Sequence, residues 1–187
     1  MNPGLQIALI PVGEVDQALL SMLEEDLPGI FTAEVEVYPL MPLCPERFVK
    51  DRGQYLADGL LDGFSSIVPL AGTLLLGITE ADLFSPGMNF IFGIANRGRA
   101  LISSYRLRPE FFGQDPNPGV FRRRILTEAV HELGHAIGLA HCEYPGCVMY
   151  FSNWIGDTDR KGPGFCFRCA RALERLMVTG IMAQDEK

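Results

Sequence analysis

Basic residues are missing from the start of the sequence, where neither lysine nor arginine occurs before Arg47. A secretory signal begins with a positively charged segment, so this absence predicts that no such signal is present. The first apolar stretch, Leu5 to Val12, is too short to cross a membrane. We therefore expect a cytoplasmic protein with no membrane partner.

The chain also lacks an excess of positive charge. It has 16 Lys and Arg residues against 23 Asp and Glu residues, which gives a formal net charge of −7. Proteins that bind nucleic acid are usually basic, because they neutralise phosphates, so we expect no nucleic-acid partner. The 187 residues, 48% of them apolar, suffice for one soluble domain with a buried core. We expect this domain to be a monomer.

Histidine and cysteine are scarce, and their positions are clustered. All three histidines fall between residues 131 and 141, and four of the five cysteines fall between residues 142 and 169. An odd number of clustered cysteines, in a chain expected to stay in a reducing compartment, favours metal binding over a disulfide framework. The two clusters are therefore the candidate sites.

The start of the chain has the pattern of a strand, a helix and a second strand. Leu5 to Val12 is a short apolar run, Val15 to Leu27 has apolar residues at helical spacing, and Ala33 to Tyr38 alternates. This order predicts two parallel strands joined by a right-handed crossover.

The middle of the chain predicts further strands. Residues 39–53 are rich in proline and charge and predict a loop, Gln54 to Leu61 predicts a short helix, and Thr73 to Thr79 predicts a buried strand. Asn89 to Ile94 and Arg99 to Arg106 are extended segments with a turn-like linker between them, which predicts an antiparallel hairpin at one edge of the sheet.

A long helix should begin at Asn117 and Pro118, an N-cap residue followed by proline at the first helical position, and should end at Gly138. A last helix is predicted from about Phe167 to Val178. The end of the chain is too short for a core of its own, so we expect a crosslink to hold it in place as a staple. We expect one domain over residues 1–187, with the sheet and long helix in 1–138 and a stapled subdomain in 139–187.

The histidines follow the pattern H-E-x-x-H-x-x-G-x-x-H. His131 and His135 lie one turn apart on the same face of a helix, so both imidazoles can hold one ion. Gly138 can adopt the left-handed conformation that ends the helix, which lets His141 turn back to that ion. Three neutral nitrogens leave one position of a tetrahedral zinc open for water, as in catalytic sites.

Glu132 follows the first of these histidines and is not needed as a ligand. A zinc ion lowers the pKa of water to about 7. We expect Glu132 to accept the proton of this water as it attacks a carbonyl, and then to pass the proton to the leaving amine.

The cysteines have the spacing of a closed four-thiolate zinc site, with 18 residues between the two pairs. The members are Cys142, Cys147, Cys166 and Cys169. Such a site is structural and would staple the end of the chain. A redox pair, two disulfides and a nucleic-acid-binding zinc ribbon are the alternatives. Cys44 lies outside the cluster and is interpreted as a half-buried thiol, with a latency switch on the catalytic zinc as the alternative.

These motifs together resemble a known family. H-E-x-x-H-x-x-G-x-x-H is the elongated signature of the metzincin metalloproteases, and its continuation into Cys142-x4-Cys147-Val148-Met149, with Cys166-x2-Cys169 later, resembles the archaemetzincins. The resemblance implies an α/β (α+β) zincin fold. That fold has a twisted mixed sheet of about five strands, a backing helix, an active-site helix and a zinc-stapled C-terminal loop and helix.

The resemblance also implies roles for individual residues. It implies two Zn²⁺ per chain, a catalytic ion on the three histidines with Glu132 as general base, and a structural ion on the four cysteines. It places Met149 in the Met-turn beneath the catalytic metal, where residue type alone suggests ordinary packing. Some metzincins add a tyrosine ligand two residues after this methionine, but Phe151 holds that position and Tyr150 is adjacent, so we expect no tyrosine ligand.

The activity implied by the resemblance is that of a peptidase, of aminopeptidase type, acting on peptides or small proteins. If Arg99 to Arg106 is the upper edge strand, a peptide could pair with it in extended form, although the edge could also be covered. A two-zinc scaffold that hydrolyses nothing and a nucleic-acid-associated zinc module are the competing functions. Glu132 favours the peptidase over the scaffold, because a protein that only holds metal needs no carboxylate there.

Overall fold

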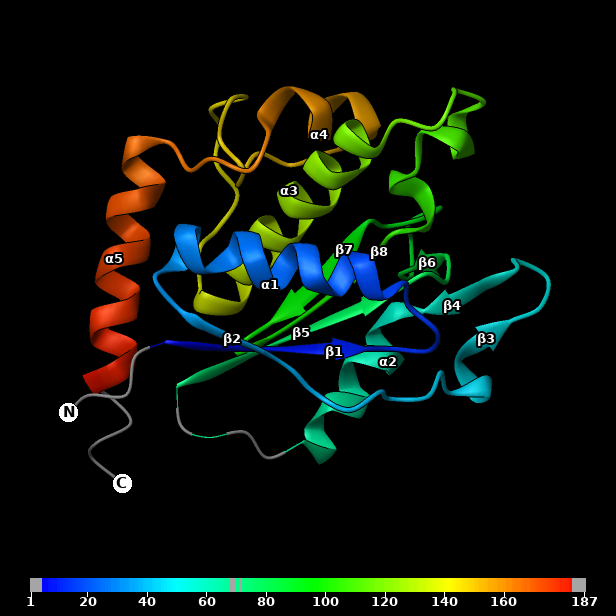
Figure 1. Cartoon of the computed structure of the whole chain (residues 1–187), viewed down its shortest axis with the longest axis horizontal. Helices are drawn as coiled ribbons and strands as arrows, with labels where there is room; N and C mark the ends of the chain where they lie inside the picture. Colours follow the sequence, from blue (N-terminus) through cyan, green and yellow to red (C-terminus); the bar gives the residue numbers. More distant parts are fainter. Residues whose placement is uncertain (1–4, 68–69, 71, 183–187) are drawn as a thin grey trace.

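The computed structural model describes residues 5–67, 70 and 72–182 (Figure 1). A five-stranded sheet with the order β2-β1-β5-β8-β7 forms the centre of the fold. Its strands are β1 (Gln6–Pro11), β2 (Glu34–Val37), β5 (Thr73–Thr79), β7 (Gly93–Asn96) and β8 (Arg99–Ser103). The first four in spatial order run parallel and β7 runs antiparallel to β8. The expected mixed sheet of about five strands is confirmed.

Helices cover both faces of this sheet because successive side chains along its strands point alternately into two apolar cores. Ile7 and Leu9 of β1 belong to the core under α1 and α3, whereas Ala8 and Ile10 belong to the core under α2. Figure 1 shows α1 and α3 on one face and α2 on the other. The bounds are α1 (Gln17–Phe31), α2 (Ala57–Gly63), α3 (Pro118–Ile137), α4 (Ile155–Lys161) and α5 (Phe167–Met182).

The predicted strand, helix and parallel strand at the start of the chain are confirmed as β1, α1 and β2. Helix α1 begins two residues later than predicted, because the side chain of Asp16 caps it by accepting a hydrogen bond from the N–H of Ala18. It also continues past Leu27 through Pro28 to the buried Phe31. Burial of this last turn therefore outweighs the helix-breaking tendency of the proline.

A second, small sheet was missed by the sequence analysis. Its strands are β3 (Phe48–Val49), β4 (Gln54–Leu56) and β6 (Leu83–Phe84). The predicted helix at Gln54 is therefore wrong at its start, where β4 precedes α2, and the predicted loop 39–53 contains β3. Strands of two or three residues are too short for a period-two pattern, so their pairing has no local signal.

The predicted antiparallel hairpin at one edge of the sheet is confirmed, but Arg99 to Arg106 is not its outer strand. Strand β8 ends at Ser103 and lies between β5 and β7, so the segment Arg99 to Arg106 is not the edge strand. The edge is β7, which begins only at Gly93. Its turn is held by the N–H of Gly98, which donates to the carbonyl of Ala136 in α3 at 2.9 Å. A peptide pairing with Arg99 to Arg106 is excluded, because both neighbours of that strand are taken.

The predicted helix ends are confirmed at α3. The side chain of Asn117 accepts from the N–H of Val120 at 3.1 Å, and Gly138 ends the helix with a φ of 118°. The last helix begins at Phe167 as predicted, and α4 was not predicted. Four short 3₁₀ turns complete the description: η1 (Pro45–Arg47), η2 (Phe64–Ser66), η3 (Tyr105–Leu107) and η4 (Pro109–Phe112).

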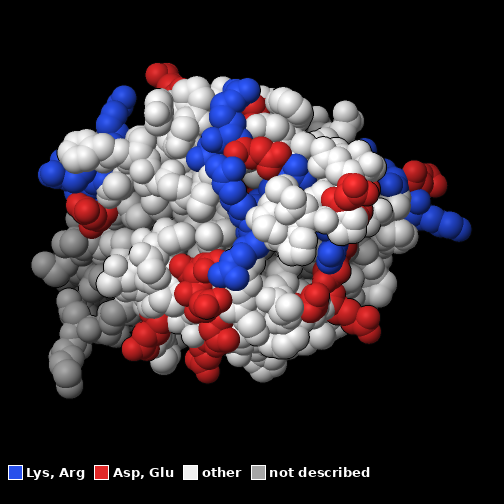
Figure 2. All heavy atoms as spheres, turned by 45° about the horizontal axis from the view of Figure 1, so that its top comes forward, with Lys and Arg blue, Asp and Glu red and all other residues white. Residues whose placement is uncertain are grey.

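The surface carries charges of both signs close together. Figure 2 shows a narrow column of Lys and Arg side chains with Asp and Glu groups beside it. One such pair joins α3 to α1, where Arg122 contacts Asp26 at 2.6 Å. Among the described residues, no helix combines the length and the apolar character that crossing a membrane requires.

Candidate active site

Helix α3 and the turn after it bring the three histidines together. The ring centroids lie 4.6 Å apart for His131 and His135, 4.7 Å for His135 and His141, and 5.5 Å for His131 and His141. Their candidate ligand atoms all lie within 4.8 Å of one another. The left-handed Gly138 produces the turn that the sequence predicts, and it brings His141 back to the helix.

Two of the rings are oriented by backbone carbonyls. Nδ1 of His131 lies 2.7 Å from the carbonyl of Val148, and Nδ1 of His135 lies 2.8 Å from that of Leu139. A carbonyl only accepts, so each Nδ1 carries the proton and each Nε2 keeps its lone pair. The two Nε2 atoms are 3.2 Å apart. Two nitrogen ligands of one tetrahedral zinc lie about 3.3 Å apart, so this donor pair fits zinc.

Glu132 lies beside the histidines and against the edge strand. It is buried, with 6% exposure. A Cβ atom on Gly93 of β7 would lie 2.6 Å from Cγ of Glu132, so only glycine leaves room for this side chain. This role of Gly93 was not predicted from the sequence, although a glycine within a strand can signal a close approach.

A cavity of about 260 Å³ opens next to Glu132. One wall is formed by residues 87–93, which lead into β7, and another by residues 151–153. His131, Glu132 and Glu128 of α3 complete the lining. The carboxylate proposed from the sequence as general base therefore borders a space that a substrate group can enter.

Burial sets the charge state of the site. Burial, together with the nearby Lys161 ammonium, lowers the pKa of His131 to about 2. Burial also lowers the pKa of His135 and His141. For Glu132, burial raises the pKa well above the ordinary value, Glu128 adds to the rise and Lys161 opposes it. The histidines are therefore neutral, as metal ligands must be.

The chelated protein should lose stability as the pH falls through about 6.5, where the unfolded chain takes up histidine protons. The folded chain takes up the His131 proton only near a pKa of about 2. Below pH 6.5 the unfolded state therefore binds more protons, and His131 alone should lower the free energy of unfolding by up to about 1.4 kcal/mol per pH unit. Urea unfolding between about pH 7.5 and 5.5 measures this slope.

Glu132 should have the opposite effect on the pH dependence of the unfolding free energy, because its pKa is raised in the folded chain and not lowered. Between its ordinary and its folded pKa the folded state binds the extra proton, so this carboxyl stabilises the fold as the pH falls. Chelated Glu132→Gln should therefore show a steeper loss than the chelated parent chain. In chelated Glu132→Gln, where this compensation is removed, a free energy of unfolding that does not change over this range would contradict the assignment of buried neutral histidines.

Met149 lies directly beneath the histidine helix. It is fully buried, and its Sδ would be 2.5 Å from a Cβ placed on Gly134, which lies between the two helical histidines. The two residues after Met149 make other contacts. The carbonyl of Tyr150 accepts a hydrogen bond from Lys161, and the ring of Phe151 lies 5.0 Å from that of His141. The side chain of Phe151 carries no ligand atom.

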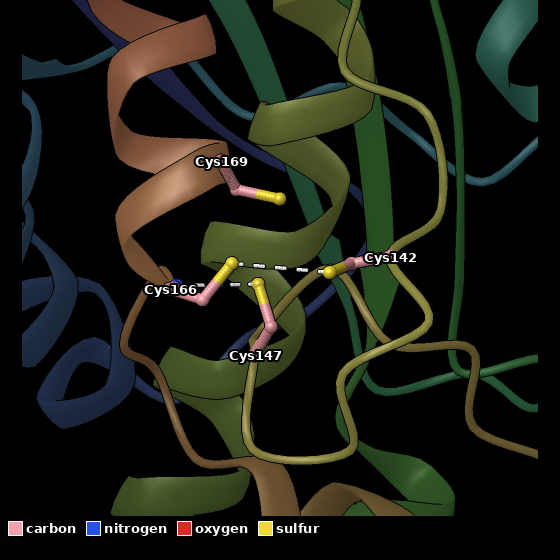
Figure 3. Close-up of side chains that lie close together, drawn as sticks. All are labelled: Cys142, Cys147, Cys166 and Cys169. Atoms are coloured by element: carbon pink, nitrogen blue, oxygen red, sulfur yellow. Dashed lines mark hydrogen bonds between the residues drawn. The ribbon is translucent and has the colours of Figure 1, made fainter.

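The four clustered cysteines converge on one point between the loop after α3 and the start of α5 (Figure 3). Sγ of Cys142 and Sγ of Cys166 are 3.9 Å apart. Two thiolates on one tetrahedral zinc lie about 3.8 Å apart, so the donor set fits zinc. The backbone N–H of Cys169 lowers the pKa of Cys166 to about 7, whereas burial raises the pKa of Cys147.

Cys44 is not part of either cluster. It packs against the core on the α2 side of the sheet, and its Sγ donates to Oε2 of Glu46 at 2.9 Å. The histidines lie on the other side, at the α3 end of the larger core. The structure therefore does not bring Cys44 to the histidines, as the latency-switch alternative requires.

Two functional candidates were missed by the sequence analysis. Glu128 and Lys161 are both buried and contact each other beside His131. Glu128 lies four residues before Glu132, so helical spacing could have placed it on the same face. Lys161 lies in the unpredicted helix α4, and no local pattern connects it with the site.

Comparison with known proteins gives a consistent result. Peptidase family M54 matches residues 48–175. A protein named archaemetzincin from Pyrococcus furiosus is 42% identical over 182 residues, which cover 93% of this chain and 95% of that protein. One from Methanocaldococcus jannaschii is 38% identical over 172 residues, with 91% and 93% covered.

Solved structures agree with these sequence relatives. Archaemetzincin from Methanopyrus kandleri has a TM-score of 0.82 and 34% identity, covering 94% of this chain and 97% of that one. Archaemetzincin from Archaeoglobus fulgidus, complexed with malonate, has a TM-score of 0.77 and 36% identity, covering 89% and 99%. The fold and the sequence thus point to one family. The chain belongs to peptidase family M54, the archaemetzincin family of zinc metallopeptidases.

Proposed function

We propose that His131, His135 and His141 hold the catalytic zinc and that Glu132 is the general base of peptide-bond hydrolysis. The observation that carries this proposal is the position of Glu132 on the cavity wall, next to a cluster of three nitrogens with two free Nε2 atoms. A metal-holding scaffold has no use for a buried carboxylate at this place, because burial of a charge is costly.

When bound, zinc supplies Lewis acidity, which acidifies water and stabilises negative charge on a carbonyl oxygen. The Glu132 carboxylate takes the proton from the attacking water and delivers it to the nitrogen of the leaving amine. Its raised pKa suits this work, because a carboxylate that is costly to keep charged is a stronger base. The carbonyls of Val148 and Leu139 keep the His131 and His135 rings in the tautomer that presents Nε2.

We extend the proposal to a second, structural zinc on Cys142, Cys147, Cys166 and Cys169. It is supported by the convergence of the four sulfurs. It is also supported by the shallow burial of α5, because Leu173 is the one buried residue among the described side chains of this helix. The site would hold residues 139–187 onto the rest of a single domain. Met149 is proposed as the Met-turn residue because it supports α3 at Gly134.

We further propose, from the family resemblance, that the peptidase acts as an aminopeptidase. An aminopeptidase must bind the α-ammonium group of its substrate. Glu128 borders the cavity, but Lys161 and Thr158 already contact its carboxylate. The recognition of an amino terminus therefore has to be tested on the products.

Incubation with a peptide set, in which each sequence is present with a free and with an acetylated amino terminus, separates the cleavage modes. We expect loss of single N-terminal residues from the free peptides and at least about tenfold slower cleavage of the acetylated ones, because the lost ammonium contact costs about 1.4 kcal/mol or more. A chelator should abolish both reactions, and added zinc should restore them.

Internal cleavage at equal rates in the free and the acetylated peptides would contradict aminopeptidase action and indicate a zinc endopeptidase. Cleavage that survives complete removal of metal would contradict the zinc mechanism itself. Mass spectrometry of the products distinguishes these results, and metal analysis of the same samples shows how much zinc each protein retains.

A further inference from the structure

Lys161 is a lysine with no exposed side-chain surface. It lies at the last position of α4, and its Nζ has three neighbours: Oε1 of Glu128 at 3.4 Å, the carbonyl of Tyr150 at 3.2 Å and Nδ1 of His131 at 3.3 Å. Lysine is rarely buried in this way unless its charge is paired. The ammonium group thus joins three segments behind the histidine site.

Its partner Glu128 is equally enclosed, with 3% of the side chain exposed. Oε1 of Glu128 also accepts a hydrogen bond from the Thr158 hydroxyl at 2.8 Å. The same hydroxyl lies 3.2 Å from Oγ of Ser152, in the segment that follows Met149. Helix α4 therefore contacts both α3 and the wall of the cavity through one polar cluster.

The contact with His131 has a defined direction. Nδ1 of this ring lies 2.7 Å from the carbonyl of Val148 and carries the proton. An ammonium group has no lone pair, so Lys161 cannot accept that proton and instead packs against the Nδ1 side of the ring. Nε2, the nitrogen toward His135, remains free.

Stability alone is a poor reason for such a pair. Removing two charges from water costs several kcal/mol per ion, and apolar residues of similar volume often serve as well. Groups that contact a metal ligand from behind, by contrast, commonly change metal affinity or activity by about 10- to 100-fold when they are altered.

We propose that the buried Glu128–Lys161 pair is a positioning device, which holds the ring of His131 and the Tyr150 carbonyl in the arrangement that presents Nε2 to the metal. The inference rests on the proposed function, because it takes His131 to be a zinc ligand. Neither residue is assigned a step in the chemistry.

The chain offers a control pair between the same two helices, in which only the arginine is buried and Asp159 is 40% exposed. Arg124 and Asp159 form another pair between α3 and α4, with Nε and Oδ1 2.7 Å apart and Arg124 4% exposed. Nη1 of Arg124 donates to the carbonyl of Leu107, and the pair does not contact a histidine ring as Lys161 does. Two double variants, Glu128→Gln with Lys161→Met and Arg124→Met with Asp159→Asn, each remove one interhelical pair without leaving a single buried charge.

Zinc affinity is measured by competition with a chelator, and His131→Ala identifies which ion belongs to the histidines. We expect the Glu128/Lys161 double variant to bind this ion about 10- to 100-fold more weakly. In zinc-saturated protein its kcat should fall while KM stays within about twofold, because a misplaced metal affects the transition state more than the ground state. The Arg124/Asp159 control should keep its zinc affinity within about twofold of the parent.

Equal losses in both double variants would overturn the proposal, because they would show that helix packing is responsible. Unchanged affinity and kcat in the Glu128/Lys161 variant would also overturn it. If that variant does not fold, Thr158→Val, which removes only the hydroxyl bound to Glu128, should weaken zinc binding by about threefold or more, and an unchanged affinity would count against the proposal. If His131→Ala holds as much zinc as the parent, the proposed catalytic site fails together with this inference.

Discussion

Replacing Glu132 with glutamine should lower kcat for peptide hydrolysis by about 10²- to 10⁴-fold and leave the zinc content unchanged. Glutamine has nearly the same shape, so it can fill the space beside Gly93, but its amide cannot take a proton from water. The side chain is not among the nitrogens that converge on the metal position, so the ion should stay. Steady-state kinetics and metal analysis of the same preparation measure both quantities.

Two further variants make this test specific. Gly93→Ala keeps the carboxylate but pushes it aside, since the new Cβ would lie 2.8 Å from its Oε1, so kcat should fall with the charge intact. Glu110→Gln changes an exposed carboxylate in η4 and should keep the parental kcat. Equal cleavage by Glu132→Gln and the parent chain would refute the proton transfer, whatever the metal content.

The histidine part of the site could be predicted because its geometry is local. His131 and His135 are joined by one helical turn, and Gly138 and His141 follow within one tight turn, so spacing along the chain determines spacing in the fold. Glu128 and Lys161 meet across 33 positions of sequence, and their contact depends on how α4 packs on α3. No local pattern carries that information.

The same distinction holds for the fold. Strands β1 and β5 are apolar runs long enough to be recognised: β5 has the predicted bounds, and β1 is one residue shorter than predicted at each end. The order of the strands is different, because a hairpin sequence predicts that β7 and β8 pair but not which of them also pairs with β5. The mistaken edge assignment of Arg99 to Arg106 arose from this non-local choice.

Replacing Cys169 with serine should remove one zinc ion per chain and release the C-terminal segment from the domain. Among the described side chains of α5, only Leu173 is buried, and Ala172, Leu176 and Met177 are half-buried against the larger core, so the apolar anchor of this helix is limited. A four-thiolate zinc site can supply about 10 kcal/mol or more of folding free energy. Metal analysis, together with amide hydrogen exchange across α5, should show the lost ion and the loss of protection there.

Cys44→Ser is the matched control, because it changes the one cysteine outside the cluster and should alter neither metal content nor exchange. The two proposed zinc sites are also joined, since Cys142 follows His141 directly and its N–H donates to the carbonyl of Met149 at 2.9 Å. Loss of the thiolate site should therefore loosen His141 and lower peptidase activity as well. If Cys169→Ser kept its full zinc content and α5 stayed protected, the cysteines would have no part in stapling the chain, and packing alone would have to hold it.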